Sequence, residues 1–339
     1  MAFQFNQQYS KRLNYSPNGT DVFRLPAANL YASFDALLVA KVNILTTASS
    51  NLPDYQIFNL IDNISLMQDV KNAVWSLSGQ ALALMFTNDL RFGGVAAAGN
   101  KTIPGTVANA VSGQHYLHCP FYPQNAPNPG EFAVDTRYHT YDLVIKWKDA
   151  TAASSLFGTI GSSVTVTANT DIYLDIQLNK LGLIPNPQTG APDILTNIKP
   201  LVVGIQEQRI GITQANSKFD IALPKFDSYR KVLLYTTDQA NTDQELGVNS
   251  VISGDVMLMN SQNQTFNDVL VTMLSQRTSQ TWGQGANINA GLYDFDFLAF
   301  GSVMDVLVTN TVNDMFLRLN VTPGTNAYVR PIMITQETQ

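Results

Sequence analysis

Two stretches of this 339-residue sequence, 198 positions apart, follow the same pattern. Residues 21–44 and 218–237 each run from a short apolar segment into a Leu-Pro pair, through a polar connector with aromatic residues, and into a second apolar segment. The pairs are Leu25-Pro26 and Leu223-Pro224. A period of this length is too long for a solenoid, whose units span about 20–50 residues. It predicts two copies of one domain.

The elements that follow occur in the same order in both copies. Val, Ile and Leu recur in short runs bounded by turn residues, which indicates strands. Ser78 and Thr265 suit the N-caps of two helices, and Asp268 would stand in an early helical turn. The predicted counterparts are strands 63–68 and 255–260, helices 78–88 and 265–277, and strands 141–146 and 304–309, with closing strands at 171–178 in the first copy and at 316–321 and 327–334 in the second.

Proline and glycine mark the boundaries. We predict an N-terminal arm over 1–20, a first domain over 21–180, a Pro-rich linker over 181–215 and a second domain over 216–339. Polar loops are predicted at 90–111, 120–130 and 280–289. Each domain is then a β-sandwich with a helix inserted after its early strands. The fold class is all-β, two tandem eight-stranded jelly rolls with short inserted helices.

The chain carries little charge. Charged residues make up 14% of it, against about 25% in a typical soluble domain. Surfaces rich in amides and hydroxyls are common in chains of large permanent assemblies and also in secreted β proteins. The net charge of −6 argues against direct binding of nucleic acid, which needs a basic surface.

The sequence also indicates in which compartment the chain is made. Its single cysteine, Cys119, excludes an internal disulfide framework. No apolar run approaches the roughly 18–20 residues that span a bilayer, and the first residues lack the apolar core of a signal peptide. We therefore expect a soluble protein made in a cytoplasm.

The predicted N-terminal arm is mildly basic. Residues 1–30 hold Lys11, Arg12 and Arg24 against Asp21. The arm is either a solvated tail or a segment that contacts an anionic surface such as lipid headgroups, with aromatic anchors. Those anchors would be Phe3, Phe5 and Tyr9.

One segment has the letters of a metal motif, His115-x-x-His118-Cys119. In a strand, His115 and His118 point to opposite faces because side chains alternate. A tetrahedral site needs further ligands, and only His139 remains. We expect packing or surface roles, with no metal site and no cofactor.

Two carboxylates share one face of a predicted strand at 292–300, namely Asp294 and Asp296. Such a pair could bind Ca²⁺ or perform acid/base chemistry, but no neighbouring residue completes a site. We expect a solvated face, opposite Tyr293, Phe295 and Phe297. The sequence lacks a Gly-x-Ser-x-Gly motif and a phosphate-binding loop, so we expect no enzyme and no catalytic residue.

From about Asp21 to Ile334, the chain resembles a double jelly-roll major capsid protein of the tailless icosahedral bacteriophages with an internal membrane, the tectivirus-like lineage. The resemblance rests on element order, the duplicated Leu-Pro strands, helix placement and size. It implies a homotrimer of six barrels, a pseudo-hexagonal tile of an icosahedral virion shell. It further implies synthesis in the host cytoplasm and contacts with neighbouring capsomers and with penton and minor capsid proteins. The N-terminal side, which holds Lys11 and Arg12, would contact the internal viral membrane. No direct contact with nucleic acid is expected, because of the net charge.

Two other function classes fit a β-sandwich. A tandem carbohydrate-binding or adhesin module would use exposed tryptophans, but Trp75 and Trp147 lie in sequence contexts typical of a core, which leaves Trp282 in a polar loop. An enzyme of the cupin type would need clustered histidine and carboxylate ligands, and the three histidines are dispersed.

Overall fold

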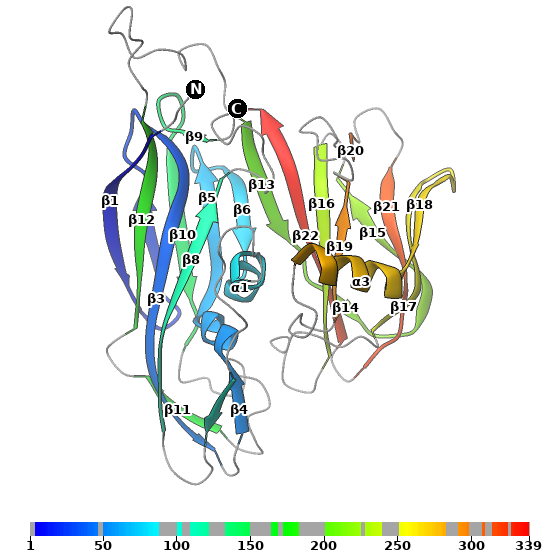
Figure 1. Ribbon diagram of the computed structural model, residues 1–339, viewed down its shortest axis with the longest axis horizontal. Helices are drawn as coiled ribbons and strands as arrows, with labels where there is room; N and C mark the ends of the chain where they lie inside the picture. Colours follow the sequence, from blue (N-terminus) through cyan, green and yellow to red (C-terminus); the bar gives the residue numbers. More distant parts are fainter. Residues whose placement is uncertain are drawn as a thin grey trace, which may run out of the picture.

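The protein is described by a computed structural model. Its strands and helices form two bodies that lie side by side (Figure 1). The structure describes residues 4–46, 50–87, 100–103, 109–121, 133–149, 164–168, 172–182, 201–224, 228–238, 251–282, 291–297, 307–308, 314–324 and 327–338.

The first body is built on two facing antiparallel sheets. The strand order is β1-β12-β3-β8 in one and β2-β10-β5-β6 in the other. The chain therefore crosses between the sheets in the order of a jelly roll. The strands are β1 (Gln4–Asn14), β2 (Thr20–Arg24), β3 (Leu30–Thr46), β5 (Ile61–Gln68), β6 (Asn72–Leu77), β8 (Asn109–Pro120), β10 (Tyr141–Trp147) and β12 (Tyr173–Gly182). Shorter elements are β4 (Ser50–Pro53), the 3₁₀ helix η1 (Asp54–Leu60), α1 (Gly79–Thr87), β7 (Asn100–Ile103), β9 (Val134–Asp135) and β11 (Val164–Ala168).

The second body repeats this arrangement. Its sheets have the orders β14-β22-β16-β19 and β15-β21-β17-β18. Strand by strand they match the first body, and α3 follows β18 as α1 follows β6. The elements are β13 (Leu201–Glu207), β14 (Ile210–Ile212), β15 (Asn216–Leu223), β16 (Ser228–Asp238), β17 (Ile252–Asn260), β18 (Thr265–Leu270), α3 (Val271–Trp282), β19 (Leu292–Asp296), β20 (Leu307–Val308), β21 (Met315–Val321) and β22 (Ala327–Thr338). The prediction of two tandem jelly rolls is confirmed.

The duplicated Leu-Pro pair marks a duplicated contact. Tyr31 donates a hydrogen bond from its hydroxyl to the carbonyl of Pro26 at 3.1 Å, and Tyr229 does the same to Pro224 at 3.0 Å. Both tyrosine side chains are fully buried. They are 198 residues apart, as are the prolines. The sequence repeat is therefore a structural repeat.

A β-bulge follows each of these tyrosines. In β3, Tyr31 pairs with Lys180 and Ser33 with Asn179, so that Ala32 is left over. In β16, Tyr229 pairs with Thr335 and Lys231 with Ile334, so that Arg230 is left over. The extra residue at the same position in both rolls keeps the two registers equivalent along the remaining strand.

A single strand joins the two rolls. β13 pairs antiparallel with β22 of the second roll and parallel with β6 of the first, through Ile205 opposite Trp75 and Gln206 opposite Ser76. Figure 1 shows β13 between β6 and β22. The indole nitrogen of Trp75 also donates to the carbonyl of Val203 at 2.8 Å. One sheet of each roll, β2-β10-β5-β6 of the first and β22-β16-β19 of the second, thereby becomes part of one continuous sheet.

Beside this strand lies a buried polar cluster. Arg330 forms an ion pair with Glu207, and both side chains are less than 10% exposed. Arg330 donates to Gln80 at 2.9 Å and to the hydroxyl of Ser78 at 3.0 Å. Glu207 accepts from the backbone N–H of Ser78 at 2.7 Å and from the Tyr235 hydroxyl. The start of α1 is thus bound to the second roll by charge-assisted hydrogen bonds.

The start of α1 follows the predicted chemistry. The Ser78 hydroxyl accepts from the N–H of Ala81 at 3.1 Å, which confirms Ser78 as the N-cap. The helix packs closely on η1, since a Cβ at Gly79 would lie 1.9 Å from the carbonyl oxygen of Phe58. Only glycine fits at that position.

The prediction for the second helix was wrong at its start. Residues 265–270 form β18, and α3 begins at Val271. Thr265 is therefore no N-cap, and Asp268 lies in a strand paired opposite Met257. Pairing with β17 overrides the helical pattern of the sequence.

The N-terminal boundary was also wrong. Residues 4–14 form β1, a full strand hydrogen-bonded along β12, with Leu13 buried. They belong to the first roll, and residues 1–3 lie outside the described part. The linker predicted over 181–215 likewise holds β13 and β14, strands of the second roll. Residues 183–200 lie outside the description.

Two further predictions were wrong, one for a strand and one for a loop. The counterpart of β10 is β21, which pairs with β15 and β17, and not the stretch 304–309, of which 307–308 form β20 beside β16. The loop predicted over 90–111 contains β7 and the start of β8. The loop at 120–130 lies outside the described residues beyond position 121. Of the loop at 280–289, residues 280–282 end α3, and the rest lies outside.

The repeated tyrosine contact can be tested by deletion of one hydroxyl at a time. Tyr31→Phe and Tyr229→Phe should each lower the free energy of unfolding by about 1 kcal/mol, because a buried carbonyl loses its donor. Urea unfolding measures the change. Tyr138→Phe, at a tyrosine that is 69% exposed, should change stability by less than about 0.5 kcal/mol. An effect at only one of the two buried tyrosines would refute their equivalence.

The joint between the rolls can be tested at its ion pair. Arg330→Met should destabilise the chain by about 3–5 kcal/mol, because it leaves Glu207 buried without its partner. Lys146→Met removes the pair with Asp62, whose two side chains are 57% and 35% exposed, and should cost at most about 1 kcal/mol. Equal losses in thermal or urea unfolding would contradict the assigned role.

Candidate assembly surface

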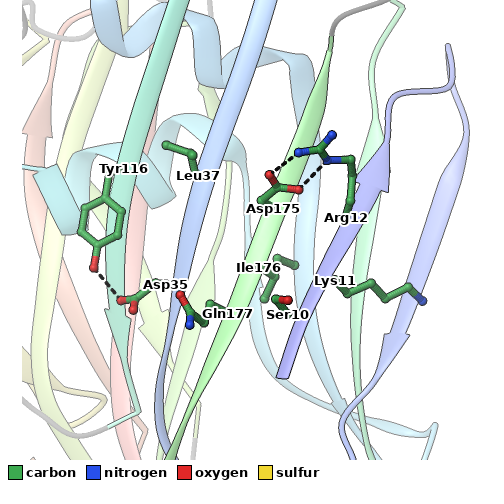
Figure 2. Close-up of a pocket in the computed structure, with 9 residues that line it drawn as sticks. All are labelled: Ser10, Lys11, Arg12, Asp35, Leu37, Tyr116, Asp175, Ile176 and Gln177. Carbon is green, nitrogen blue, oxygen red and sulfur yellow. Dashed lines mark hydrogen bonds and ion pairs between the residues drawn. The ribbon is translucent and has the colours of Figure 1, made fainter. Parts of the chain in front are cut away.

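The outer face of the sheet β1-β12-β3-β8 is a broad, shallow surface. Strand register places Ser10, Gln177, Asp35 and His118 in one row across it. The next row holds Arg12, Asp175, Leu37 and Tyr116. A hollow of about 630 Å³ lies over these rows, and Figure 2 shows the side chains that line it. We call this surface the first outer face.

Asp35 is the centre of a hydrogen-bonded group on this face. It lies within 2.7 Å of Nδ1 of His118 and accepts from the Tyr116 hydroxyl at 2.8 Å and from Asn179 at 3.1 Å. Asn179 also donates to Ser33 at 2.9 Å. Burial alone would raise the pKa of Asp35, but the three hydrogen bonds outweigh it and lower that pKa. Burial and the neighbouring carboxylate raise the pKa of Tyr116.

Arg12 is held in place by two partners. Its guanidinium binds the Asp175 carboxylate through two hydrogen bonds of 2.7 and 2.8 Å, seen in Figure 2. These bonds raise the pKa of Arg12. The guanidinium also lies over the Tyr173 ring at 3.7 Å. In the second roll, Arg209 lies over the Tyr328 ring at 4.0 Å. The repeated cation–π pair gives Arg12 a role in the fold of the roll.

Lys11 points away from the other residues of the hollow in Figure 2. Its ammonium group donates to the backbone carbonyl of Val22 at 3.1 Å and lies 5.4 Å from the centre of the Phe23 ring. It therefore ties β1 to β2 of the facing sheet. A contact of Lys11 and Arg12 with a membrane stays a prediction.

The histidines of the apparent metal motif separate as strand alternation predicted. His115 is opposite Leu38 in β3 and lies edge-on to the Phe58 ring, whereas His118 is opposite Asp35 on the outer face. His139 lies within 2.8 Å of Asp69. Cys119 is fully buried, which raises the pKa of its thiol. Among the described residues, no three potential ligands gather as a metal site.

The expectation of a solvated face at Asp294 was wrong. Asp294 is only 2% exposed and forms an ion pair with Lys231 at 3.2 Å, and its backbone N–H donates to Thr278 of α3 at 2.8 Å. One side of the sheet that contains β19 faces the core of its own roll, and the other side is covered by the first roll and by α3. The side chain of Asp296 lies outside the described part. Tyr293 and Phe295 are buried as expected.

Two tryptophans are core residues, as their sequence context predicted. Trp75 and Trp147 are at most 1% exposed, and the Trp147 indole donates to Asp21 at 3.0 Å. Neither can stack on a sugar. The side chain of Trp282 lies outside the described residues.

The second roll carries an exposed apolar edge. β18 is the end strand of its sheet, and α3 follows it directly. Phe266, Leu270 and Met273 are 44%, 50% and 63% exposed. A hollow of about 810 Å³ is lined by Leu270 and Met273, together with Asp268 and Arg277. We call this surface the helix edge. The sequence did not indicate this surface, because residues 265–270, which form β18, were predicted as helix.

No helix in the described ranges has the length and apolar character of a membrane span. The first outer face was missed as well. Its polar residues in β12 alternate with buried Leu174, Ile176 and Leu178, and this period-2 pattern is the sequence signal that could have revealed the face.

The Asp35 group predicts an acid dependence of stability. A lowered pKa in the folded chain gives a stabilisation that is present above the unfolded pKa of about 3.9 and is lost as the pH falls through the folded value. Asp35→Asn should therefore be less stable than the original chain at neutral pH, and the gap should close in acid. Urea unfolding between about pH 6 and pH 3 measures this. Parallel profiles would contradict it.

Comparison with known proteins gives the fold its context. No family model and no curated protein matches the sequence. Solved structures match nearly the whole chain. The STIV MCP crystal structure has a TM-score of 0.70 at 11% identity, covering 100% of this chain and 97% of that one. The major capsid protein P2 of bacteriophage PM2 has a TM-score of 0.59 at 12% identity, covering 100% and 98%. The PBCV-1 virus capsid has a TM-score of 0.60 at 12% identity, covering 99% of this chain and 93% of that one. The chain has the fold of the double jelly-roll viral major capsid proteins.

Proposed function

We propose that this chain is the major capsid protein of an icosahedral virus, and that its function is to assemble with copies of itself. The observation that carries the proposal is the full-length match of both rolls, with their joint, to viral major capsid proteins. A chance likeness of one jelly roll would cover half of the chain. No enzymatic activity is proposed.

The surfaces of the chain support this proposal. The first outer face and the helix edge are broad and shallow, and they lie on different rolls. Exposed apolar residues that gather on one surface are typical of protein contacts. The low charge of the chain also suits burial between subunits, since unpaired buried charge is costly.

We further propose the homotrimer, a pseudo-hexagonal tile of six rolls, as the assembling unit. The shell would surround an internal membrane, with penton and minor capsid proteins at its vertices and edges and no direct contact with nucleic acid. Synthesis would take place in the host cytoplasm. A bacteriophage host is the class that the sequence resemblance predicts, and one structural neighbour comes from a bacteriophage.

The solution mass of the purified chain tests the proposal. Light scattering should give about three times the 37.2 kDa chain mass, unchanged by a chelator. Electron microscopy of more concentrated samples should then show six-sided tiles. A chain that stays monomeric at every concentration, or that binds a glycan column as a monomer, would contradict the capsid proposal.

A further inference from the structure

The first roll carries a strained turn between β5 and β6. The N–H of Lys71 closes this turn by donating to the carbonyl of Gln68 at 3.1 Å. The two central residues, Asp69 and Val70, have φ values of 50° and 64°. Positive φ at both positions is the geometry of a type I′ turn, where asparagine and glycine are the usual residues. A β-branched residue is unfavourable there, yet Val70 is present and is 65% exposed.

The equivalent turn of the second roll is built without this strain. It joins β17 to β18 through residues 261–264, whose side chains are all polar and exposed. Its residue with positive φ is Asn263, at 61°, and asparagine tolerates that conformation. Asn260 supports the turn by accepting from the N–H groups of Gln262 and Gln264 at 3.1 and 2.9 Å. The jelly roll therefore does not require an exposed, strained valine, and strain of this kind points to a function.

A second turn is bound to the strained one. The Asp69 carboxylate accepts from the N–H and the hydroxyl of Thr140 at 2.9 and 3.2 Å and lies within 2.8 Å of Nδ1 of His139. The N–H of Asp69 also donates to the carbonyl of Thr140 at 2.8 Å. Tyr138, the residue before His139, is 69% exposed. We call residues 69–71 and 138–140 the hairpin tip.

The charged groups of this region leave a lysine exposed to solvent. The Asp69 carboxylate is bound as described, and Asp135 binds the Arg137 guanidinium through two hydrogen bonds of 2.9 and 2.7 Å. Lys71, by contrast, is exposed. The hairpin tip thus presents an aliphatic side chain, a tyrosine and a lysine. Tyrosine is favoured at the headgroup level of a bilayer, and lysine is attracted to anionic lipids.

Strand register places the hairpin tip at the end of the first roll where β1 begins. Gln4 pairs with Gly182 at the end of β12, and β12 pairs with the start of β3. There Leu30 pairs with Asp135 of β9, which lies at the top of the first roll in Figure 1. Lys11 lies seven residues after Gln4, which is about 23 Å along the strand at about 3.3 Å per residue. The exposed groups at this end are therefore those of the tip.

We propose that the hairpin tip is a lipid-contact site, in which Val70 and Tyr138 enter the interface of an anionic bilayer and Lys71 binds lipid phosphates. This inference rests on the proposed capsid function and names the residues through which the N-terminal side contacts the internal membrane. The hydrogen bonds of Asp69 hold the turn in shape before lipid is bound. Binding therefore does not have to order the tip.

The size of the tip favours a lipid over a protein partner. A stable protein contact buries about 800 Å² on each partner, and two side chains on adjacent turns supply only a small part of that area. A bilayer interface accepts single side chains one by one. Each tip then binds weakly, and the copies held in one assembly bind the same bilayer together.

Flotation of the purified full chain with vesicles tests the site. The chain should float with vesicles of phosphatidylcholine and phosphatidylglycerol, and more weakly with phosphatidylcholine alone, which carries no net charge for Lys71 to bind. Lys71→Gln should reduce the difference between the two kinds of vesicle. Tyr138→Ser should lower the affinity for the mixed vesicles about tenfold, and Val70→Asn about threefold.

Val70→Asn separates lipid contact from folding, because its two effects have opposite signs. Asparagine suits the positive φ, so the variant should unfold at a temperature about 2 °C higher than the original chain while it binds vesicles more weakly. Val22→Asn is the matched control. Val22 is 50% exposed within strand β2, where valine is favoured. This control should not unfold at a higher temperature and should bind vesicles as the original chain does.

Light scattering of the same samples separates this inference from the capsid proposal. An oligomer that floats with neither kind of vesicle, or whose flotation is unchanged by Val70→Asn and Tyr138→Ser, overturns the lipid site and leaves the capsid function in place. A chain that is monomeric at every concentration, yet floats through Val70 and Tyr138, supports the lipid site and overturns the capsid function. A monomer that does not float overturns both.

Discussion

The structure depends on one strand that belongs to two sheets. β13 continues the sheet of the second roll and pairs in parallel with β6 of the first. Backbone hydrogen bonds alone would not fix the register of β13 on β6, because the N–H and C=O groups at a sheet edge can pair with another strand in more than one register. The buried pair of Arg330 and Glu207 removes that freedom, because a shift would leave two charges without partners in a low-dielectric site. The joint therefore fixes the position of each roll relative to the other.

The two rolls share their internal construction and differ on their outer faces. The tyrosine–proline contact, the bulge after the tyrosine and the arginine–tyrosine stack occur in both. At equivalent outer positions, however, the second roll has Leu233 and Ile332 where the first has Asp35 and Gln177. The apolar face is buried as soon as the chain folds. The more polar face suits a surface that is exposed to solvent in the single chain.

Much of the fold could be predicted from the sequence, because local patterns carry it. The Leu-Pro repeat, the matching order of the elements that follow it and the N-cap at Ser78 predicted two jelly rolls with inserted helices. The errors arose where tertiary pairing decides the structure. Residues 265–270 have a helical sequence pattern but form a strand, because they pair with β17. The basic segment with Lys11 and Arg12 forms strand β1, because it pairs with β12.

The surfaces were harder to predict, for a related reason. The first outer face joins residues from four strands that are distant in sequence, such as Arg12 and Asp175, and no local pattern brings them together. Asp294 was expected in solvent because it shares the polar face of a strand with Asp296, opposite the aromatic residues, and the polar face of a half-buried strand is usually exposed. It is buried because the sheet has the first roll on one side and its own roll on the other, and Lys231 balances its charge. Only the arrangement of both rolls shows this.

The central claim is the proposal that this chain is a major capsid protein that assembles with copies of itself. Averaged electron microscopy images of the purified oligomer test it most directly. The account predicts six-sided tiles, each made of three two-lobed chains. Images that show only single two-lobed particles at every concentration would contradict it.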